Sequence, residues 1–285
     1  MSRRMRTYFY AVLGAIGGLV GWQVSDYLGL SFTTNLYLSE VVAGALIGLV
    51  IGLFIGLTEG LLTRNLVQAL KSGLFGAILG TLAGGVGLPL GEFLFQAVGA
   101  GLTGRVLGWA VFGLMLGFAE GGVARSQAWK GMLGGLIGGG LGGVLLESAH
   151  NWLEDPLTGK AAGLVLLGAS VGAFISLIVV LLSRAWLEVT SGKLKGTEFI
   201  LDKFMRAGGP AVAIGSSALK SEIALPDPDI APQHAMLTGD GTRFSLKDMS
   251  LAGTYVNGKK IQVVQLANGQ KIRMGNTEMI YHERR

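Results

Sequence analysis

Cysteine is absent from this 285-residue chain, and histidine occurs only three times. Without a thiol the chain can hold no disulfide, no thiolate metal centre and no cysteine nucleophile. The three histidines are scattered, and none has a histidine or glutamate partner at the spacing of a metal site. Because no serine-hydrolase or phosphate-binding-loop motif occurs either, we expect no catalytic residue, no metal, no cofactor and no enzymatic activity.

Charge and proline are also scarce, at 14% charged residues and 6 prolines, whereas half of the chain is hydrophobic and glycine reaches 48 residues. Such a composition indicates a membrane protein, and the absence of a Gly-X-Y register excludes collagen. Most of the apolar runs reach the roughly 20 residues that span a bilayer. The fifth is short, so it must continue through Glu147 toward Trp152, tilt, or re-enter without crossing. The six runs are 8–30, 41–62, 73–95, 106–123, 132–146 and 161–182.

Arginine and lysine gather before the first run, in alternate loops, and after the sixth run, while the other loops carry only Arg105 and Lys160. The positive-inside rule then places both termini in the cytoplasm, as in a bacterial inner-membrane protein. The net charge of +5 follows largely from this topology, so we expect a lipid bilayer as partner and no nucleic acid. Tryptophans near span ends, Trp186 among them, are expected to be interfacial anchors.

Glycine recurs every fourth residue from Gly44 to Gly60 in the second run. This spacing places the glycines in one stripe along a helix. In lipid such a stripe lets two helix backbones approach closely. It supports packing within the bundle as readily as between chains, so a homo-oligomer remains open.

An internal repeat relates GLFIGLTEGLLTR (52–64) to GLMLGFAEGGVAR (113–125), and 72–85 to 130–143. Glycines of the first and sixth runs fit the same scheme. The membrane part is therefore expected to be an α-helical bundle of three parallel hairpin repeats about an axis along the membrane normal. The glycines expected to pack these helices are Gly52, Gly56, Gly60, Gly76, Gly80, Gly113, Gly117, Gly121, Gly134, Gly138, Gly168 and Gly172.

Two carboxylates, Glu59 and Glu120, occupy equivalent positions in this repeat, where the third copy has Ile175. An ionisable residue inside a span is costly and is by default a functional-site hypothesis. The two could flank a polar path between repeats for ions, protons or a lipid headgroup. Alternatively, they lie near the cytoplasmic interface and reach headgroup water or a neighbouring arginine.

Composition changes after Arg184, where short alternating segments separated by turn signals replace the apolar runs. This pattern predicts an all-β sandwich. We expect a transmembrane domain at 1–188, a linker at 189–196 and a cytoplasmic sandwich at 197–285.

Five motifs follow in order in this last part. They are IGSS (214–217), IALPDPDIAPQHA (223–235), FSLKDMSLAGTYVNGKKI (244–261), LANGQKIRMG (266–275) and MIY (279–281). Together they resemble a forkhead-associated (FHA) domain, a β-sandwich that recognises phosphothreonine peptides. The positions that the resemblance brings forward, mostly as structural residues, are Gly215, Ser216, Ala231, His234, Ala252, Gly253, Thr254, Asn257 and Gly258.

Three of these positions depart from the family. Ser216 stands where the family has an arginine, Ala231 where it has a serine, and Ala252 where it has an asparagine. A phosphate needs charge-assisted donors, ideally a guanidinium. We therefore expect a membrane-anchored interaction or scaffold protein whose FHA-like domain recruits a cytoplasmic protein, or its own chain, without phosphothreonine. The alternative is a small channel, transporter or lipid-handling protein regulated by that domain.

Overall fold

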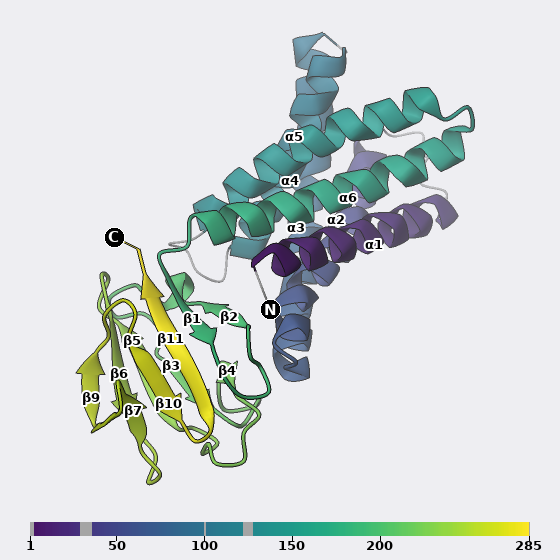
Figure 1. Ribbon diagram of the computed structural model, residues 1–285. Coiled ribbons are helices and arrows are strands. Elements are labelled where there is room, and N and C mark those ends of the chain that lie inside the picture. Colours follow the sequence, from purple (N-terminus) through teal and green to yellow (C-terminus); the bar gives the residue numbers. More distant parts are fainter. Residues whose placement is uncertain (1–2, 29–35, 100, 122–127, 285) are drawn as a thin grey trace. The chain divides into compact units, whose positions relative to one another are not determined.

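The computed structural model describes residues 3–28, 36–99, 101–121 and 128–284. The chain forms two compact units, and each is described by itself. One is helical and is built from Arg4–Glu59 and Ala69–Leu181, while the other includes Leu182–Arg285 (Figure 1).

The described residues contain six helices that are long and apolar enough to cross a membrane. They are α1 (Arg3–Tyr27), α2 (Leu36–Leu62), α3 (Leu66–Val98), α4 (Leu102–Gly121), α5 (Ala128–Trp152) and α6 (Pro156–Leu181). The short fifth run thus belongs to a 25-residue helix. That is more than the roughly 20 residues needed to cross a bilayer.

Helix α3 buries its small residues and exposes its large apolar side chains. All of its buried residues are glycine or alanine, whereas large apolar side chains such as Leu70, Leu74 and Leu82 are exposed. A water-soluble protein would place these side chains in its core. The distribution suits a helix whose surroundings are lipid and whose neighbours approach it through small residues.

Helices α2 and α3 are in backbone contact along an antiparallel seam. A Cβ atom added to Gly52 would meet the carbonyl of Gly76, and one added to Gly48 would meet that of Gly80. The reverse also holds, because a Cβ on Gly76 or Gly80 would meet the carbonyl of its partner. Any side chain along this seam would force the two helices apart.

The same contact recurs in two further helix pairs. In α4 and α5, Gly113 faces the backbone of Gly135, and in α6 and α1, Gly168 faces the backbone of Gly14. The third pair therefore joins the last helix to the first. Gly56, Gly117 and Gly172 extend the three seams by facing the carbonyls of Ser72, Gly131 and Tyr10, respectively.

A second set of glycines joins each pair to the next. A Cβ added to Gly17 of α1 would lie 2.9 Å from the Cα of Ile51 in α2. A Cβ added to Gly142 of α5 would lie 2.9 Å from the Cα of Leu167 in α6. Gly87 of α3 approaches Phe112 of α4 in the same way, at 3.1 Å. Consecutive helices are thus in contact, and the contact of α6 with α1 closes the cycle.

The remaining glycines of the predicted set are placed differently. Gly134 and Gly138 face α6 rather than the hairpin partner α4. The carbonyl of Gly60 accepts the N–H of Asn65 at 2.8 Å, at the end of α2. Gly121 is the last residue of α4, but its surroundings lie outside the described part of the structure.

The other unit is a β-sandwich of two sheets with strand orders β2-β1-β11-β10-β7-β8 and β4-β3-β5-β6-β9 (Figure 1). Its core holds side chains with no exposed surface, including Leu237, Phe244, Leu246 and Tyr281. The strands are β1 (Ala185–Val189), β2 (Glu198–Ile200), β3 (Val212–Gly215), β4 (Ile223–Ala224), β5 (Ala235–Gly239), β6 (Phe244–Asp248), β7 (Thr254–Val256), β8 (Lys259–Ile261), β9 (Val263–Gln265), β10 (Lys271–Met274) and β11 (Thr277–Glu283).

Strand β1 pairs with β11 along its whole length, from Ala185 opposite Glu283 to Val189 opposite Met279. Residues that we expected to precede the sandwich therefore supply one of its strands. The expectation that Trp186 is an interfacial anchor was wrong, because it lies in β1. Its ring is buried and stacks on His282 with centroids 5.0 Å apart.

Candidate functional site

Three loops meet at one end of the sandwich. They are 216–222 between β3 and β4, 225–234 between β4 and β5, and 249–253 between β6 and β7. The first two are joined because the N–H of Ser216 donates to the carbonyl of Ala231 at 3.0 Å. We call these three loops the loop apex.

His234 links the loops of the apex. Its side chain has no exposed surface, and its Nδ1 accepts the N–H of Ala231 at 3.1 Å. Its Nε2 lies 3.2 Å from the carbonyl oxygen of Gly253, so this nitrogen carries the proton and donates it. The N–H of Met249 donates to the His234 carbonyl at 2.9 Å. One buried neutral imidazole thus holds the second and third loops in place.

The turn before β7 depends on Gly253, whose φ is +88°. A side chain there would be strained and would meet the side chain of Lys260. The N–H of Gly253 donates to Ser250 Oγ at 3.3 Å. Thr254, which follows, donates its hydroxyl to Asp248 at 2.9 Å. The turn is therefore fixed on both sides of the glycine.

Two further glycine positions have distinct roles. Gly215, at the end of β3, has no room for a side chain, because a Cβ would meet the Pro232 carbonyl and Ser221 Oγ. Asn257 and Gly258 form the β7–β8 hairpin turn with φ values of +48° and +80°, as a two-residue hairpin requires. This hairpin turn lies beside Lys271, whose N–H donates to Asn257 Oδ1 at 3.0 Å.

Asp227 fixes the second loop of the apex against β11. Burial alone would raise the pKa of its carboxyl group. Hydrogen bonds from the Asp229 N–H, the Thr277 hydroxyl and the Asn276 N–H outweigh burial, so the pKa lies below its ordinary value. The carboxylate thus stays ionised and tied to the β10–β11 turn.

A model of the FHA domain family matches residues 212–275, a span that contains all three loops of the apex. Residues 212–275 are an FHA domain. The match does not extend into the helical unit.

Curated relatives of this FHA domain include proteins named a glycogen accumulation regulator and an oxoglutarate dehydrogenase inhibitor. The chain is 32% identical over 98 residues to the glycogen accumulation regulator GarA of Mycolicibacterium smegmatis, a match that covers 34% of this chain and 58% of the relative. It is 31% identical to an oxoglutarate dehydrogenase inhibitor of Corynebacterium jeikeium, covering 34% of this chain and 63% of the relative. The chain thus spans a little over half the length of the curated relatives it matches.

Solved structures of FHA domains are also similar. One is the FhaA FHA domain complexed with the intracellular domain of Rv3910, at 30% identity, with 34% of this chain and 99% of that one covered and a TM-score of 0.30. Another is the FHA domain of the CT664 protein from Chlamydia trachomatis, at 29% identity, with 36% and 100% covered and a TM-score of 0.32.

At Ser216, Ala231 and Ala252, the three positions expected to depart from the family, backbone N–H groups make the loop contacts. Ser216 uses its backbone N–H to hold Ala231, and the N–H of Ala252 donates to Ser250 Oγ at 3.0 Å. At these three positions the side chains supply one neutral hydroxyl and two methyl groups. The cation that lies against this turn is Lys260, whose Nζ is 2.8 Å from the Cβ position of Gly253.

Sequence reasoning did not single out Lys260. The signal was present in the Asn257–Gly258 turn, which sets the register of the hairpin. That register places Lys260 opposite Tyr255. The side chain of Lys260 can therefore reach back to the Gly253 turn.

In the helical unit, Glu59 of α2 lies 3.9 Å from Arg6 of α1, measured between Glu59 Oε1 and Arg6 Nη2. The Arg6 guanidinium also lies over the ring of Tyr10, 5.5 Å from its centroid. Glu120 belongs to α4, but its side chain lies outside the described part of the structure.

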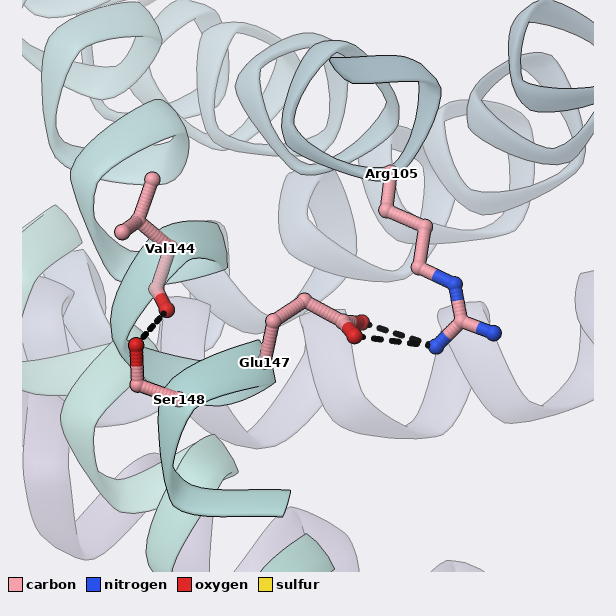
Figure 2. A network of polar contacts seen from close by, with 4 residues as sticks. All are labelled: Arg105, Val144, Glu147 and Ser148. Atoms are coloured by element: carbon pink, nitrogen blue, oxygen red, sulfur yellow. Dashed lines mark hydrogen bonds and ion pairs between the residues drawn. The ribbon is translucent and has the colours of Figure 1, made fainter. Parts of the chain in front are cut away.

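A second ion pair in this unit was missed by sequence reasoning. Arg105 of α4 donates from Nη1 to both carboxylate oxygens of Glu147 of α5, at 2.9 and 3.1 Å (Figure 2). Glu147 is almost fully buried, whereas half of the Arg105 side chain is exposed. The Arg105 guanidinium also lies 5.3 Å from the ring centroid of Phe95 of α3. Arg105 thus joins three helices.

Proposed function

We propose that this protein is a membrane-anchored interaction protein whose FHA domain recruits a cytoplasmic partner without phosphothreonine. The observation that carries the proposal is the state of the loop apex. His234, Gly253 and Thr254 make the contacts that hold the loops, while the side chains of Ser216, Ala231 and Ala252 offer a phosphate one neutral hydroxyl and no charged donor.

The energetic argument concerns the phosphate charge. A phosphothreonine carries about −1.5 to −2 charges at neutral pH, and charge-assisted hydrogen bonds are roughly twice as strong as neutral ones. One serine hydroxyl cannot replace a guanidinium, an amide and a hydroxyl. An intact apex without these donors is better suited to a partner that it recognises by other chemistry.

Similar proteins support a binding role. The FhaA FHA domain was crystallised with the intracellular domain of another protein, and the GarA relatives are described as regulators. We extend to this chain only the class of activity, which is binding a protein rather than catalysing a reaction.

The six apolar helices support insertion into a membrane, and we propose the inner membrane with both termini in the cytoplasm, according to the loop charges. The glycine seams, which could have joined two chains, are used between helices of one chain. These seams therefore do not require a second copy.

The channel or transporter alternative has less support. Ile51, Phe112 and Leu167 directly precede Gly52, Gly113 and Gly168, the glycines of the three seams, and all three are fully buried. Large apolar side chains thus occupy matching buried places in each pair. Glu59 meets Arg6, which supports the interpretation that this carboxylate is paired.

The test is recovery of partners by the full-length protein, solubilised from its own membranes, with and without phosphatase treatment of the cytosol. We expect the same partners in both conditions. The matched control is Gly253→Val, which should distort the turn that His234 holds and abolish recovery. Partners that disappear after phosphatase treatment would contradict phosphate independence, and no partner in either condition would contradict recruitment itself.

A further inference from the structure

The six-stranded sheet of the sandwich turns one face toward the core and one away from it, and we call the second its outer face. Ile272 of β10 and Met279 of β11 have no exposed surface and belong to the core. Their neighbours Lys271, Arg273 and Glu278 are exposed. Because successive side chains of a strand point to opposite faces, these three charged residues lie on the outer face.

Charges on the outer face are separated by sign. The sheet has the strand order β2-β1-β11-β10-β7-β8 (Figure 1). The anions are Glu198 on β2, Glu188 on β1 and Glu278 on β11, and the cations are Lys271 and Arg273 on β10 and Lys260 on β8. The line between β11 and β10, which we call the midline, thus divides the outer face into an acidic half and a basic half.

Two further basic residues lie in the acidic half, toward the end of β11, and both have partners within the domain. His282 Nε2 lies 3.0 Å from Glu188 Oε2, and the Arg284 guanidinium lies 5.1 Å from the ring centroid of Trp186. Glu188 is therefore engaged by its own chain. The separation of charge is clearest beside the midline.

Arg273 and Glu278 are the charges that flank the midline. They are directly opposite each other on β10 and β11, but in the described part of the structure they form no ion pair with each other or with another side chain. The Arg273 guanidinium instead lies over the ring of Tyr255 on β7, 4.5 Å from its centroid. A guanidinium and a carboxylate are therefore both available to a molecule that covers the outer face.

This distribution of charge is self-complementary. A two-fold axis that runs along the midline, between two outer faces, lays the basic half of each copy on the acidic half of the other. Arg273 of each copy then faces Glu278 of the second copy. Homo-oligomers commonly associate through such contacts, in which the same surface serves on both sides, and complementary charge selects the partner and the register.

The same axis keeps the strands of both copies running in one direction. Both β1 strands, which begin at Ala185 a few residues after α6, then start at the same end of the pair. Two chains anchored in one membrane, as proposed above, need this arrangement. An axis across the strands would instead place like charges against each other and the two β1 starts at opposite ends.

The outer face is large enough for a reversible contact. Six strands about 4.8 Å apart and about 17 Å long give a footprint of roughly 500 Å² per copy, at the lower end of specific interfaces. Tyr255 and Ile280 are partly buried on this face and add apolar area near the midline. Tyrosine and arginine are among the residues that commonly contribute most to binding at interfaces.

We propose that the outer face of the six-stranded sheet binds a second copy of this chain, with reciprocal ion pairs between Arg273 and Glu278 across a two-fold axis. Tyr255 and Ile280 pack between the two sheets. This self-association goes beyond the recruiting function and does not depend on what the loop apex binds.

The test measures energy transfer between full-length chains reconstituted together in phosphatidylcholine liposomes. The chain has no cysteine, so Ala211→Cys gives each copy a single position for a donor or acceptor dye. Ala211 is exposed and directly precedes β3 of the other sheet, which keeps the dye off the outer face. We expect transfer above that of randomly placed chains, and we expect it to decrease as salt screens the ion pairs.

Charge reversal at the midline should weaken association at least tenfold. Arg273→Glu alone and Glu278→Arg alone each place like charges across the two-fold axis. Mixed with each other, the two variants should associate as the parent does, because the acidic side chains of one copy then face the basic side chains of the other. The matched control Lys247→Glu reverses an exposed charge on β6 of the other sheet and should leave transfer unchanged.

Three results would overturn the proposed interface. The first is a parent without transfer above the random level, and the second is equal transfer by the parent and Arg273→Glu. The third is a mixture of Arg273→Glu with Glu278→Arg that does not associate, although one chain carrying both substitutions is as stable as the parent. That result would mean that Arg273 and Glu278 act only within one chain.

Discussion

The seam between α4 and α5 predicts opposite outcomes for the same substitution at two adjacent residues. Gly139 and Gly140 both lie inside α5. A Cβ on Gly139 would lie 3.0 Å from the Cα of Gly113 and closer still to the carbonyl of Trp109. A Cβ on Gly140 would have Ala110 Cβ as its nearest neighbour, at 3.7 Å, which is an ordinary van der Waals contact.

The expected magnitude follows from these distances. Carbon atoms are most favourably placed about 3.5–4.0 Å apart, so Gly139→Ala forces the helices apart by several tenths of an ångström or more. Overpacking of this kind typically costs about 1–3 kcal/mol. The gain in helix propensity from glycine to alanine, about 1 kcal/mol, is common to both variants and cancels. Gly139→Ala should therefore be about 1–3 kcal/mol less stable than Gly140→Ala.

The measurement is reversible unfolding of the full chain by sodium dodecyl sulfate in dodecyl maltoside micelles, followed by circular dichroism. Gly140→Ala should unfold at the same detergent fraction as the parent or a higher one, and Gly139→Ala at a clearly lower one. Equal midpoints for the two variants would refute the backbone contact at this seam.

Three further predictions concern polar groups. Arg105→Gln should destabilise the helical unit by roughly 1–3 kcal/mol. This loss is smaller than that from breaking a fully buried ion pair, because half of the Arg105 side chain is exposed. Adding Glu147→Gln in the same chain should recover part of the lost stability in the detergent titration. Hydrogen bonds from the Arg243 and Thr242 N–H groups lower the pKa of Asp240 to about 2 from an ordinary 3.8, so its contribution to stability is complete above pH 3.8 and is lost as the pH falls toward 2. Asp240→Asn should flatten the decrease in the melting temperature of the sandwich over this range, and an unchanged decrease would exclude Asp240 as its source. His234→Ala leaves buried partners unsatisfied at about 1–3 kcal/mol each and should speed amide hydrogen exchange at 249–253, whereas unchanged exchange would remove its role as the link between loops.

The sequence indicated the class of both units because each has a strong local pattern. Long apolar runs specify membrane-spanning helices almost by composition, and ordered turn motifs such as Asn257–Gly258 specify a β-sandwich. It also placed Gly52 and Gly76 in one repeat.

Contacts between distant residues were harder to predict. Glycine spacing does not say which helix a stripe meets, so neither the pairing of α6 with α1 nor the position of Gly134 against α6 followed from it. Arg105 and Glu147 lie in different helices, and nothing local links them. Strand β1 was missed because AWLEV directly follows an apolar helix and its partner β11 lies at the far end of the chain.

The site shows the same division. His234 and Gly253 were found from motifs, whereas Lys260 was missed because its relevance depends on hairpin register. Leu219 and Leu251 of the loop apex are exposed, which depends on the tertiary structure and could not be predicted from a motif.

Recognition of a partner without phosphothreonine is tested by comparing the binding of one peptide in two forms to the FHA domain. Binding of a phosphothreonine peptide and its unphosphorylated counterpart to the full chain in nanodiscs is measured by calorimetry. A triple variant, Ser216→Arg with Ala231→Ser and Ala252→Asn, serves as the positive control. We predict that the parent does not distinguish the two forms and that the triple variant prefers the phosphorylated one at least tenfold. A parent that prefers the phosphorylated form by that margin would contradict recognition without phosphothreonine.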